Sequence, residues 1–382
     1  MQKKRFFGSV ALTLVSVFSF GSCSLLNGIL GNQSESSEEV YMAVRATSPK
    51  DGGRAVLANE DISNFAAGYT KYAAEDYAYR GDHYVMSGLT LEWEADGTPQ
   101  SYEIKLSENS NLSNAMEFET ESAELHIDDL FVNTAYYWQI TAIYADKKET
   151  SKINEFTTAK TPRTLNIDGV SNTRDIGGMN LADGKQIRQG MIYRGGALDG
   201  ITQEGKMAAL ETYGIKTDLD LRNMAEGTAG ESSPLGEGVN YVHVNASPYY
   251  LGGTTGVDYS GNWGALATSM RVFTKAENFP VYVHCSLGRD RTAAVCFLVE
   301  ALLGASQEDI FMDYETSFFS KLGNTDGQTV EYMVNSFSGL YNYIAGNYGR
   351  GDTLAQKCEK FLISDVGLTQ SEVDAIRKNL TK

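Results

Sequence analysis

The sequence predicts two domains of different fold class: an all-β sandwich, followed by an α/β domain with a central sheet flanked by helices. The chain has 382 residues, enough for two domains of ordinary size. Between residues 41 and 160, apolar and polar residues alternate with the period of half-buried strands. From residue 161 on, continuous apolar runs of strand length alternate with runs of helix length, as in α/β domains. We expect the two parts, separated near Lys160-Thr161-Pro162, to fold independently.

The N-terminus is expected to direct export. Lys3-Lys4-Arg5 precedes an apolar stretch from Phe6 to Phe20, which is too short for a confident transmembrane helix. Because small residues stand directly before Cys23, residues 1–22 resemble a bacterial lipoprotein signal, with Cys23 as the lipidated first residue of the mature chain. The resemblance implies a lipoprotein of a bacterial cell envelope, periplasmic or at the cell surface, held to the membrane by its lipid alone. An ordinary signal peptide with an incidental cysteine is the alternative.

Residues 23–40 are rich in Gly, Asn, Gln, Ser and Glu, which predicts a flexible tether. Four short alternating runs follow, separated by turn signals such as Asp96-Gly97. These runs are Leu89–Trp93, Tyr102–Leu106, Leu125–Ile127 and Tyr136–Ala142. Short strands at this spacing favour a β-sandwich. A helix is expected around Asn59–Tyr72, because the stretch 59–83 is too long for a simple loop.

One corner of the expected sandwich has a recognisable pattern. The segment Leu130-Phe-Val-Asn-Thr-Ala-Tyr136 resembles the Leu-x-Pro-x-Thr-x-Tyr corner of fibronectin type III domains, with Val132 in place of proline. Trp93 stands where that fold buries its early tryptophan. The resemblance implies a fibronectin III-like or immunoglobulin-like sandwich over residues 41–160. We find no catalytic constellation there, so a spacer is the leading interpretation, and the many tyrosines leave ligand binding open.

Nine residues of the second domain carry its chemistry: His284-Cys-Ser-Leu-Gly-Arg-Asp-Arg-Thr292. The apolar run Pro280–His284 predicts a buried strand, and Thr292–Leu303 predicts a buried helix that ends at Gly304. A loop from a strand into a helix turns its backbone N–H groups into one concavity, where the helix N-terminus adds partial positive charge. Such a site holds a phosphate dianion, and the same field lowers the pKa of a cysteine.

Each residue type in this run suits one task. Cys285 is the expected nucleophile, which would form a phosphocysteine. Arg291 can place two parallel hydrogen bonds on phosphate oxygens. Thr292 is expected to donate its hydroxyl hydrogen to the cysteine sulfur, and His284 to order the loop. The phosphate-binding loop is Ser286, Leu287, Gly288 and Arg289. We expect no metal and no cofactor, because the chain has four histidines and no Cys-x2-Cys.

Cys-x5-Arg-Thr preceded by His is typical of the protein tyrosine phosphatase superfamily. Four further segments resemble, in order, the motifs of its bacterial and fungal subfamily with a Lys-Asp-Arg-Thr-type loop. They are Asn172–Gly178, Arg188–Arg194, Gly214–Arg222 with Glu226, and Gly367–Val373. The resemblance covers about residues 163–382 and implies a tyrosine phosphatase domain over 161–382. This chain departs from the subfamily at Arg289, usually Lys, and at Ala293, usually Gly. Thr369 and Glu372 predict a capping box for a last helix.

The general acid is left open among three carboxylates. The resemblance implies Asp290, which stands next to Arg291 in the loop; its alternative role is to orient an arginine. Asp258 lies in the glycine-rich stretch 251–258, which could close over the site. Asp220 precedes Arg222 at an expected strand end, and its plainer role is to pair with that arginine.

Arg174, Asp220 and Arg222 are expected to support the site, as is Arg194, although each also suits an ordinary salt bridge. The cysteines other than Cys23 are Cys285, Cys296 and Cys358, too few for a disulfide framework.

The net charge of −17 excludes binding of nucleic acid or of an anionic membrane through the general field of the protein. The resemblance implies that the partner is a phosphorylated protein or a small phosphate ester. The leading function is a protein tyrosine or dual-specificity phosphatase. The alternative is a phosphatase of inositol polyphosphates or phosphoinositides, which would need basic residues beyond Arg289 and Arg291. A non-catalytic phosphate-binding module is disfavoured, because Cys285 and Arg291 are both present.

Overall fold

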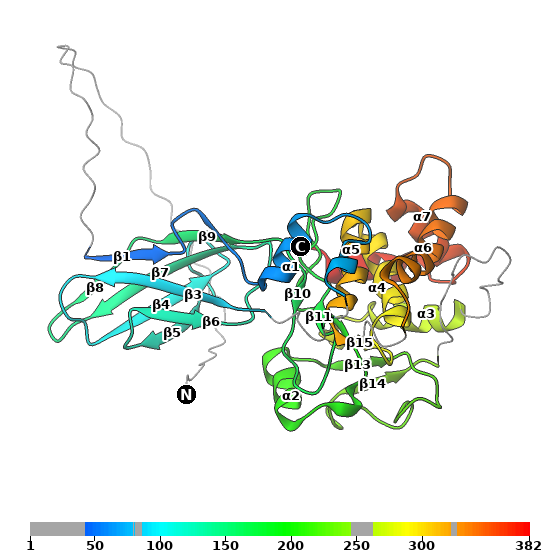
Figure 1. Ribbon diagram of the computed structural model, residues 1–382, viewed down its shortest axis with the longest axis horizontal. Coiled ribbons are helices and arrows are strands. Elements are labelled where there is room, and N and C mark those ends of the chain that lie inside the picture. Colours follow the sequence, from blue (N-terminus) through cyan, green and yellow to red (C-terminus); the bar gives the residue numbers. More distant parts are fainter. Residues whose placement is uncertain (1–42, 79, 81–85, 246–262, 322–326) are drawn as a thin grey trace, which may run out of the picture. The chain divides into compact units, whose positions relative to one another are not determined.

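The computed structural model describes residues 43–78, 80, 86–245, 263–321 and 327–382 (Figure 1). The predicted signal peptide, Cys23, the tether and Asp258 lie outside the described residues.

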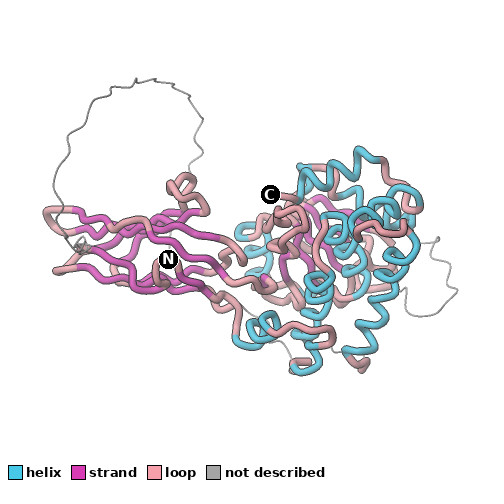
Figure 2. The backbone as a smooth tube through the Cα atoms, turned by 90° about the horizontal axis from the view of Figure 1, so that it is seen from above, coloured by secondary structure: helices cyan, strands magenta, loops and turns pink. Residues whose placement is uncertain are grey.

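The described chain forms two compact units that interleave along the sequence. The first contains the residues up to Gly52, Leu91–Leu125 and Tyr136–Phe156. The second contains Gly53–Thr90, His126–Ala135 and Thr157–Lys382. This division differs from the single boundary expected near Lys160, because two earlier segments belong to the second unit. Figure 2 shows only strands and loops in the first unit, and helices around strands in the second.

The first unit is built from antiparallel strands in two sheets. One sheet has the order β1-β3-β6, and the other contains the path β9-β7-β4-β5 with β8 beside β7. The strands are β1 (Val44–Ser48), β3 (Leu89–Ala95), β4 (Ser101–Ser107), β5 (Met116–Thr120), β6 (Glu124–Ile127), β7 (Ala135–Ile143), β8 (Lys148–Thr150) and β9 (Asn154–Thr158). Trp93 of the first sheet packs edge-on against Tyr102 and Trp138 of the second. The four predicted alternating runs are strands β3, β4, β6 and β7.

A six-stranded mixed sheet organises the second unit, in the order β10-β11-β12-β15-β13-β14. Its strands are β10 (Arg163–Thr164), β11 (Arg174–Asp175), β12 (Ile192–Gly195), β13 (Thr217–Asp220), β14 (Asn240–His243) and β15 (Val281–His284). Strands β12, β15, β13 and β14 are parallel, whereas β10 and β11 pair antiparallel at the edge. Because the carboxyl ends of parallel strands meet at one edge, residues that follow β15 and β13 lie close together. The predicted α/β class of this domain is confirmed.

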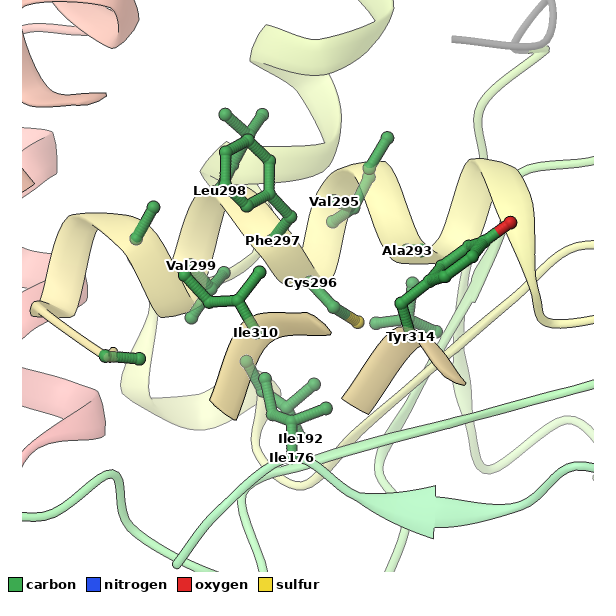
Figure 3. Packing of buried hydrophobic residues seen from close by; sticks show 14 of the residues in the cluster. Ile176, Ile192, Ala293, Val295, Cys296, Phe297, Leu298, Val299, Ile310 and Tyr314 are labelled. Carbon is green, nitrogen blue, oxygen red and sulfur yellow. The ribbon is translucent and has the colours of Figure 1, made fainter. Parts of the chain in front are cut away.

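Helices surround this sheet, with α4 at the centre of their packing. The main helices are α1 (Glu60–Ala67), α2 (Gln203–Met207), α3 (Trp263–Val272), α4 (Asp290–Leu303), α5 (Gln307–Thr316), α6 (Val330–Asn347), α7 (Leu354–Ser364) and α8 (Gln370–Leu380). Two short 3₁₀ turns matter below: η1 (Ala73–Asp76) and η6 (Ser317–Phe319). Every residue of α4 from Thr292 to Leu303 is buried. Figure 3 shows Cys296 of α4 and Ile310 of α5 gathered beside Ile176 and Ile192.

Local signals set several helix ends as the sequence predicts. Helix α4 ends at Gly304, whose φ of 95° is a conformation that glycine adopts without strain. The capping box of Thr369 and Glu372 is present at the start of α8. Asn59 caps α1 by accepting a hydrogen bond from Ile62 N–H, so the helix expected around 59–72 is found over a shorter span. Within the described ranges, no helix is both long and apolar enough to cross a membrane.

Candidate active site

The Cys285 loop connects the central strand of the sheet to the central helix of the unit. It leaves β15 at His284 and enters α4 at Asp290, as the apolar runs on either side predict. Gly288 has a φ of +68°, and a Cβ on it would lie 2.1 Å from the carbonyl oxygen of Gly195. Only glycine fits at this position. The loop thus curls tightly against the end of β12, with Cys285 only 2% exposed at its base.

The carbonyl groups of residues 286–289 are all held from outside the loop. The Ala197 N–H donates to the carbonyl of residue 286 at 3.1 Å, and the Asn172 amide donates to that of residue 287 at 2.9 Å. Arg194 donates to the carbonyls of residues 288 and 289 at 2.8 and 3.2 Å. Because the carbonyl and N–H of a peptide unit point in opposite directions, the loop N–H groups are turned toward its inner side. This is the arrangement of an anion-binding nest.

A buried carboxylate holds the two arginines behind the loop. Asp313 of α5 accepts a hydrogen bond from Arg174 Nε at 2.7 Å and another from Arg194. Arg174 also donates to the Asn172 side-chain oxygen at 2.6 Å, which orients the amide that grips the loop. Burial alone would raise the pKa of Asp313, but the two guanidinium groups lower it, so the carboxylate is ionised. Arg174 and Arg194 therefore form the scaffold of the loop and are not surface arginines.

Arg291 is held by Glu226, a residue of the loop after β13. The two Glu226 oxygens accept from Arg291 NH1 and NH2, both at 2.7 Å, which is a bidentate pair. Ser286 donates its hydroxyl hydrogen to the same carboxylate. The hydrogen bonds from Arg291 are the main cause that lowers the pKa of Glu226 to about 2. Glu226 stays ionised at any physiological pH and orients the guanidinium toward the sulfur side of the loop.

Two carboxylates of β13 flank the histidine that precedes the nucleophile. His284 Nε2 lies 2.9 Å from Asp218 Oδ1, and Nδ1 lies 3.9 Å from Asp220 Oδ1; all three side chains are fully buried. The Nε2 contact is an ion pair when the ring is protonated. Burial lowers the pKa of His284, but the two carboxylates outweigh it, so the net shift is upward. The His284 ring Nδ1 also contacts the Cys285 carbonyl at 3.2 Å, as expected of a residue that orders the loop.

Asp220 and Arg222 pair with each other. Asp220 accepts from the Arg222 backbone N–H at 2.9 Å, from its guanidinium at 2.8 Å, and from the Tyr241 hydroxyl at 3.0 Å. Burial raises the pKa of Asp220, but the hydrogen bonds from Arg222 and the charge of His284 outweigh it and lower the pKa. Asp220 is thus buried and ionised, which suits a structural partner and not a proton donor. Arg222 pairs on its other side with Asp199.

Asp290, the first residue of α4, is held by two neighbours. Arg289 Nε lies 3.1 Å from its Oδ1, and the Tyr314 hydroxyl donates to the same oxygen at 3.1 Å. The side chain keeps 13% of its surface exposed, whereas that of Arg289 keeps 1%. Thr292 is fully buried, and its hydroxyl has no hydrogen-bond partner among the described residues. The predicted hydrogen bond from Thr292 to sulfur therefore stays a prediction. In the described ranges, no three His, Cys, Asp or Glu side chains gather as a metal-ligand set.

The sequence analysis missed three residues of this site. Asp313 belongs to no motif, and Asp218 lies in the segment Gly214–Arg222 but was given no role. An acid in a mixed helix or strand is usually exposed. Glu226 was noted only as part of a resemblance, without a role. A signal was present for Asp218, which stands two residues before Asp220 in β13 and so shares its face of the strand.

With this geometry in view, comparison with known proteins decides the family. A model described as "Tyrosine phosphatase family" matches residues 165–382, more than half of the chain. The chain belongs to the tyrosine phosphatase family. Its resemblance to a phosphatase of this kind is thereby confirmed at the level of the family.

Two individual relatives are more distant. A protein of Cupriavidus necator, assigned by name as a tyrosine-protein phosphatase, is 28% identical in an alignment of 179 positions that covers 39% of this chain. The match spans 61% of that relative, less than two thirds of its length. Among solved structures, the core catalytic domain of the PP-IP phosphatase SIW14 from S. cerevisiae, in complex with citrate, is 20% identical. The similarity covers 40% of this chain and 85% of that one, with a TM-score of 0.26.

Proposed function

We propose that this member of the family hydrolyses phosphotyrosine, or phosphotyrosine together with phosphoserine and phosphothreonine, in proteins through a phosphocysteine intermediate. The Cys285 thiolate attacks phosphorus, an S–P bond forms, and the ester P–O bond breaks. Asp290 gives its proton to the leaving oxygen and then takes a proton from the attacking water. The S–P bond breaks in this second step, which releases phosphate and restores the thiolate.

The observation that carries this proposal is the outward tethering of the loop carbonyls at residues 286–289. It leaves the N–H groups and the Arg291 guanidinium to face one place, where the phosphoryl oxygens would gather negative charge. Donors that are already in position need no reorganisation during the reaction. Local preorganisation of this kind suits a protein whose net charge of −17 repels anionic substrates at a distance.

The pairing of the arginines favours a substrate with one phosphate group. A polyphosphate needs further cations around the reacting group. Apart from Arg291, which is the arginine proposed to bind the reacting phosphoryl group, the arginines around this loop pair with carboxylates: Arg174 and Arg194 with Asp313, Arg222 with Asp199 and Asp220, and Arg289 with Asp290. The sequence of residues 246–262 and 322–326 contains no Lys or Arg. Inositol polyphosphates and phosphoinositides are therefore the second candidate.

A substrate panel on the protein lacking residues 1–23 tests this proposal. We expect turnover of phosphotyrosine peptides, with slower or no turnover of inositol hexakisphosphate and phosphoinositides. Cys285→Ser should abolish turnover yet still bind phosphate, because the loop N–H groups and Arg291 remain. Arg291→Lys should also be severe, since an ammonium group cannot form the bidentate contact. Near wild-type turnover by Cys285→Ser would rule out covalent catalysis, and a clear preference for polyphosphates would favour the second candidate.

We also propose that the protein is an exported lipoprotein anchored through Cys23, and that the β unit is a fibronectin III-type spacer. The support is the sequence of residues 1–23, and for the spacer the antiparallel sheets with Trp93 in their core. Mass spectrometry of the N-terminal peptide from cells is the test. An unmodified Cys23 in the membrane fraction, or a protein retained in the cytoplasm, would contradict the anchor.

A further inference from the structure

A segment that precedes most of the sandwich strands in the chain is part of the catalytic unit. Residues 53–90 contain α1 and η1 and lie outside the region matched by the family model. Three donors of this segment converge on the buried Glu315 carboxylate at the end of α5. They are the Tyr69 hydroxyl at 2.9 Å, the Tyr72 N–H at 2.9 Å and the Ala74 N–H at 3.1 Å. A carboxylate so far from water depends on these donors.

Aromatic contacts reinforce the same junction. The Phe65 ring of α1 is fully buried, with its centroid 4.9 Å from that of Phe319 in η6. Tyr77 stacks on the same Phe319 ring at 5.1 Å. Lys71 donates to the Ser338 hydroxyl at 3.2 Å, which ties the segment to α6 as well. The segment is therefore packed into the core of the unit, not laid over its surface.

The end of α5 and the turn η6, which contact the N-terminal segment through Glu315 and Phe319, also contact the phosphate loop. The Tyr314 hydroxyl donates to Asp290, and the Arg289 guanidinium lies 5.8 Å from the centroid of the Phe318 ring. Ser317 accepts from Arg174 at 3.1 Å. Residues 314, 317 and 318 thus face the loop, whereas their neighbours Glu315 and Phe319 face the N-terminal segment. A displacement of either face moves the other, because interiors are close-packed.

We propose that residues 59–77 are a positioning element of the phosphatase site. By holding Glu315 and Phe319, they set Tyr314 and Phe318 against Asp290 and Arg289. The inference rests on the proposed function, in which Asp290 is the acid. It also implies that a fragment starting at residue 163 lacks part of what positions its site.

Leaving-group dependence distinguishes a positioning role from plain structural support. An acidic phenol leaves without a proton, whereas tyrosine needs one, so a misplaced Asp290 slows only the second reaction. We expect Phe65→Ala to lose roughly tenfold in kcat on phosphotyrosine peptide, a fraction of the full effect of a missing acid, and much less on p-nitrophenyl phosphate. Phe65→Leu should restore most of the loss. Phe156→Ala, which removes an equally buried ring from the first unit, should change neither rate.

An equal loss of kcat on both substrates would overturn the inference, because a smaller folded fraction lowers both rates alike. No loss in Phe65→Ala would overturn it as well. If Phe65→Ala does not fold, Tyr69→Phe removes only one hydrogen bond to Glu315, and the same rate ratio decides. A wild-type protein inactive on all phosphate esters would instead refute the proposed function. If Asp290→Asn shows no leaving-group dependence, the acid role fails and the inference fails with it.

Discussion

The two units contain ion pairs of the same chemical kind at opposite degrees of burial. In the sandwich, the pairs Arg45–Glu94, Lys105–Glu117, Lys148–Glu103 and Lys152–Asp51 have side chains that are 41% to 70% exposed. In the catalytic unit, the pairs Arg163–Asp175, Arg174–Asp313, Arg194–Asp313 and Arg222–Asp220 are at most 6% exposed. Exposed pairs contribute little to stability because water and salt screen them. Buried pairs cost desolvation, and breaking one leaves an uncompensated charge.

This difference shows what the buried charges are for. A hydrophobic core would stabilise the unit at least as well, so stability alone does not account for Arg174 and Arg194 behind the loop. Arg194 holds two carbonyls of the phosphate loop, and Arg174 orients the Asn172 amide that holds a third. The buried pairs set geometry, whereas the exposed pairs keep a surface soluble.

Among the carboxylates paired with arginines around the loop, Asp290 has the largest expected effect on rate, because it exchanges a proton in the proposed reaction. We expect Asp290→Asn to lose roughly 10²–10⁴ in kcat on phosphotyrosine and little on an acidic phenyl phosphate. Steady-state kinetics on both substrates measures the ratio. Asp258→Asn is the matched control, and a leaving-group-dependent loss in that variant alone would assign the acid to Asp258. If neither variant shows it, the acid is neither Asp290 nor Asp258.

Breaking the central buried pair should cost several kcal/mol. Asp313→Asn removes the charge between Arg174 and Arg194, so we expect a loss of about 3–5 kcal/mol in the free energy of unfolding of the catalytic unit. Urea unfolding, followed by a signal from that unit, measures it. A loss below about 1 kcal/mol would show that the two guanidinium groups find other partners. The buried pairs would then contribute no more to stability than the exposed pairs of the sandwich.

A smaller effect, which appears in the pH dependence of stability, is expected from substitution of Asp218. The folded pKa of His284 is raised above its ordinary value of 6.5, so its charge stabilises the fold fully below about pH 6.5 and less as pH rises through the folded pKa. Asp218→Asn should lower that pKa, and the stability gap between variant and wild type should shrink at high pH. NMR titration of the His284 ring and unfolding at several pH values test this. An unchanged His284 midpoint would contradict the pairing.

The smallest effect belongs to the exposed pairs. Glu103→Gln should change the free energy of unfolding of the sandwich by less than about 1 kcal/mol, because both partners are half exposed. The change should shrink further in 1 M salt, where the screening length is about 3 Å. A salt-insensitive loss of several kcal/mol would remove the contrast between the units.

Local signals explain what the sequence predicted well. Strand β15, helix α4 with its end at Gly304, the four alternating strands and the capping box at Thr369 depend on periodicity and on neighbours within a few residues. The phosphate loop belongs to this class, since its strand, loop and helix are consecutive in the chain.

Distant pairings explain what the sequence missed. Asp313 meets Arg174 across 139 positions, and Glu315 meets Tyr69 across 246. No periodicity reports such contacts, because any buried carboxylate can satisfy a buried arginine. For the same reason, the segment around α1 was assigned to the sandwich domain of residues 41–160 and not to the unit with which it packs.

The contact between Gly288 and Gly195 bears on how freely the site can change in evolution. A Cβ on Gly195 would lie 2.2 Å from the Tyr282 hydroxyl oxygen, just as one on Gly288 would meet the Gly195 carbonyl. A methyl group on Gly288 would meet the Gly195 backbone, and one on Gly195 would meet the Tyr282 side chain. The specificity of the site can change by substitution of residues at its rim. Neither of these two glycines offers a side chain to a substrate, yet a substitution at either one would disturb the packing of the site.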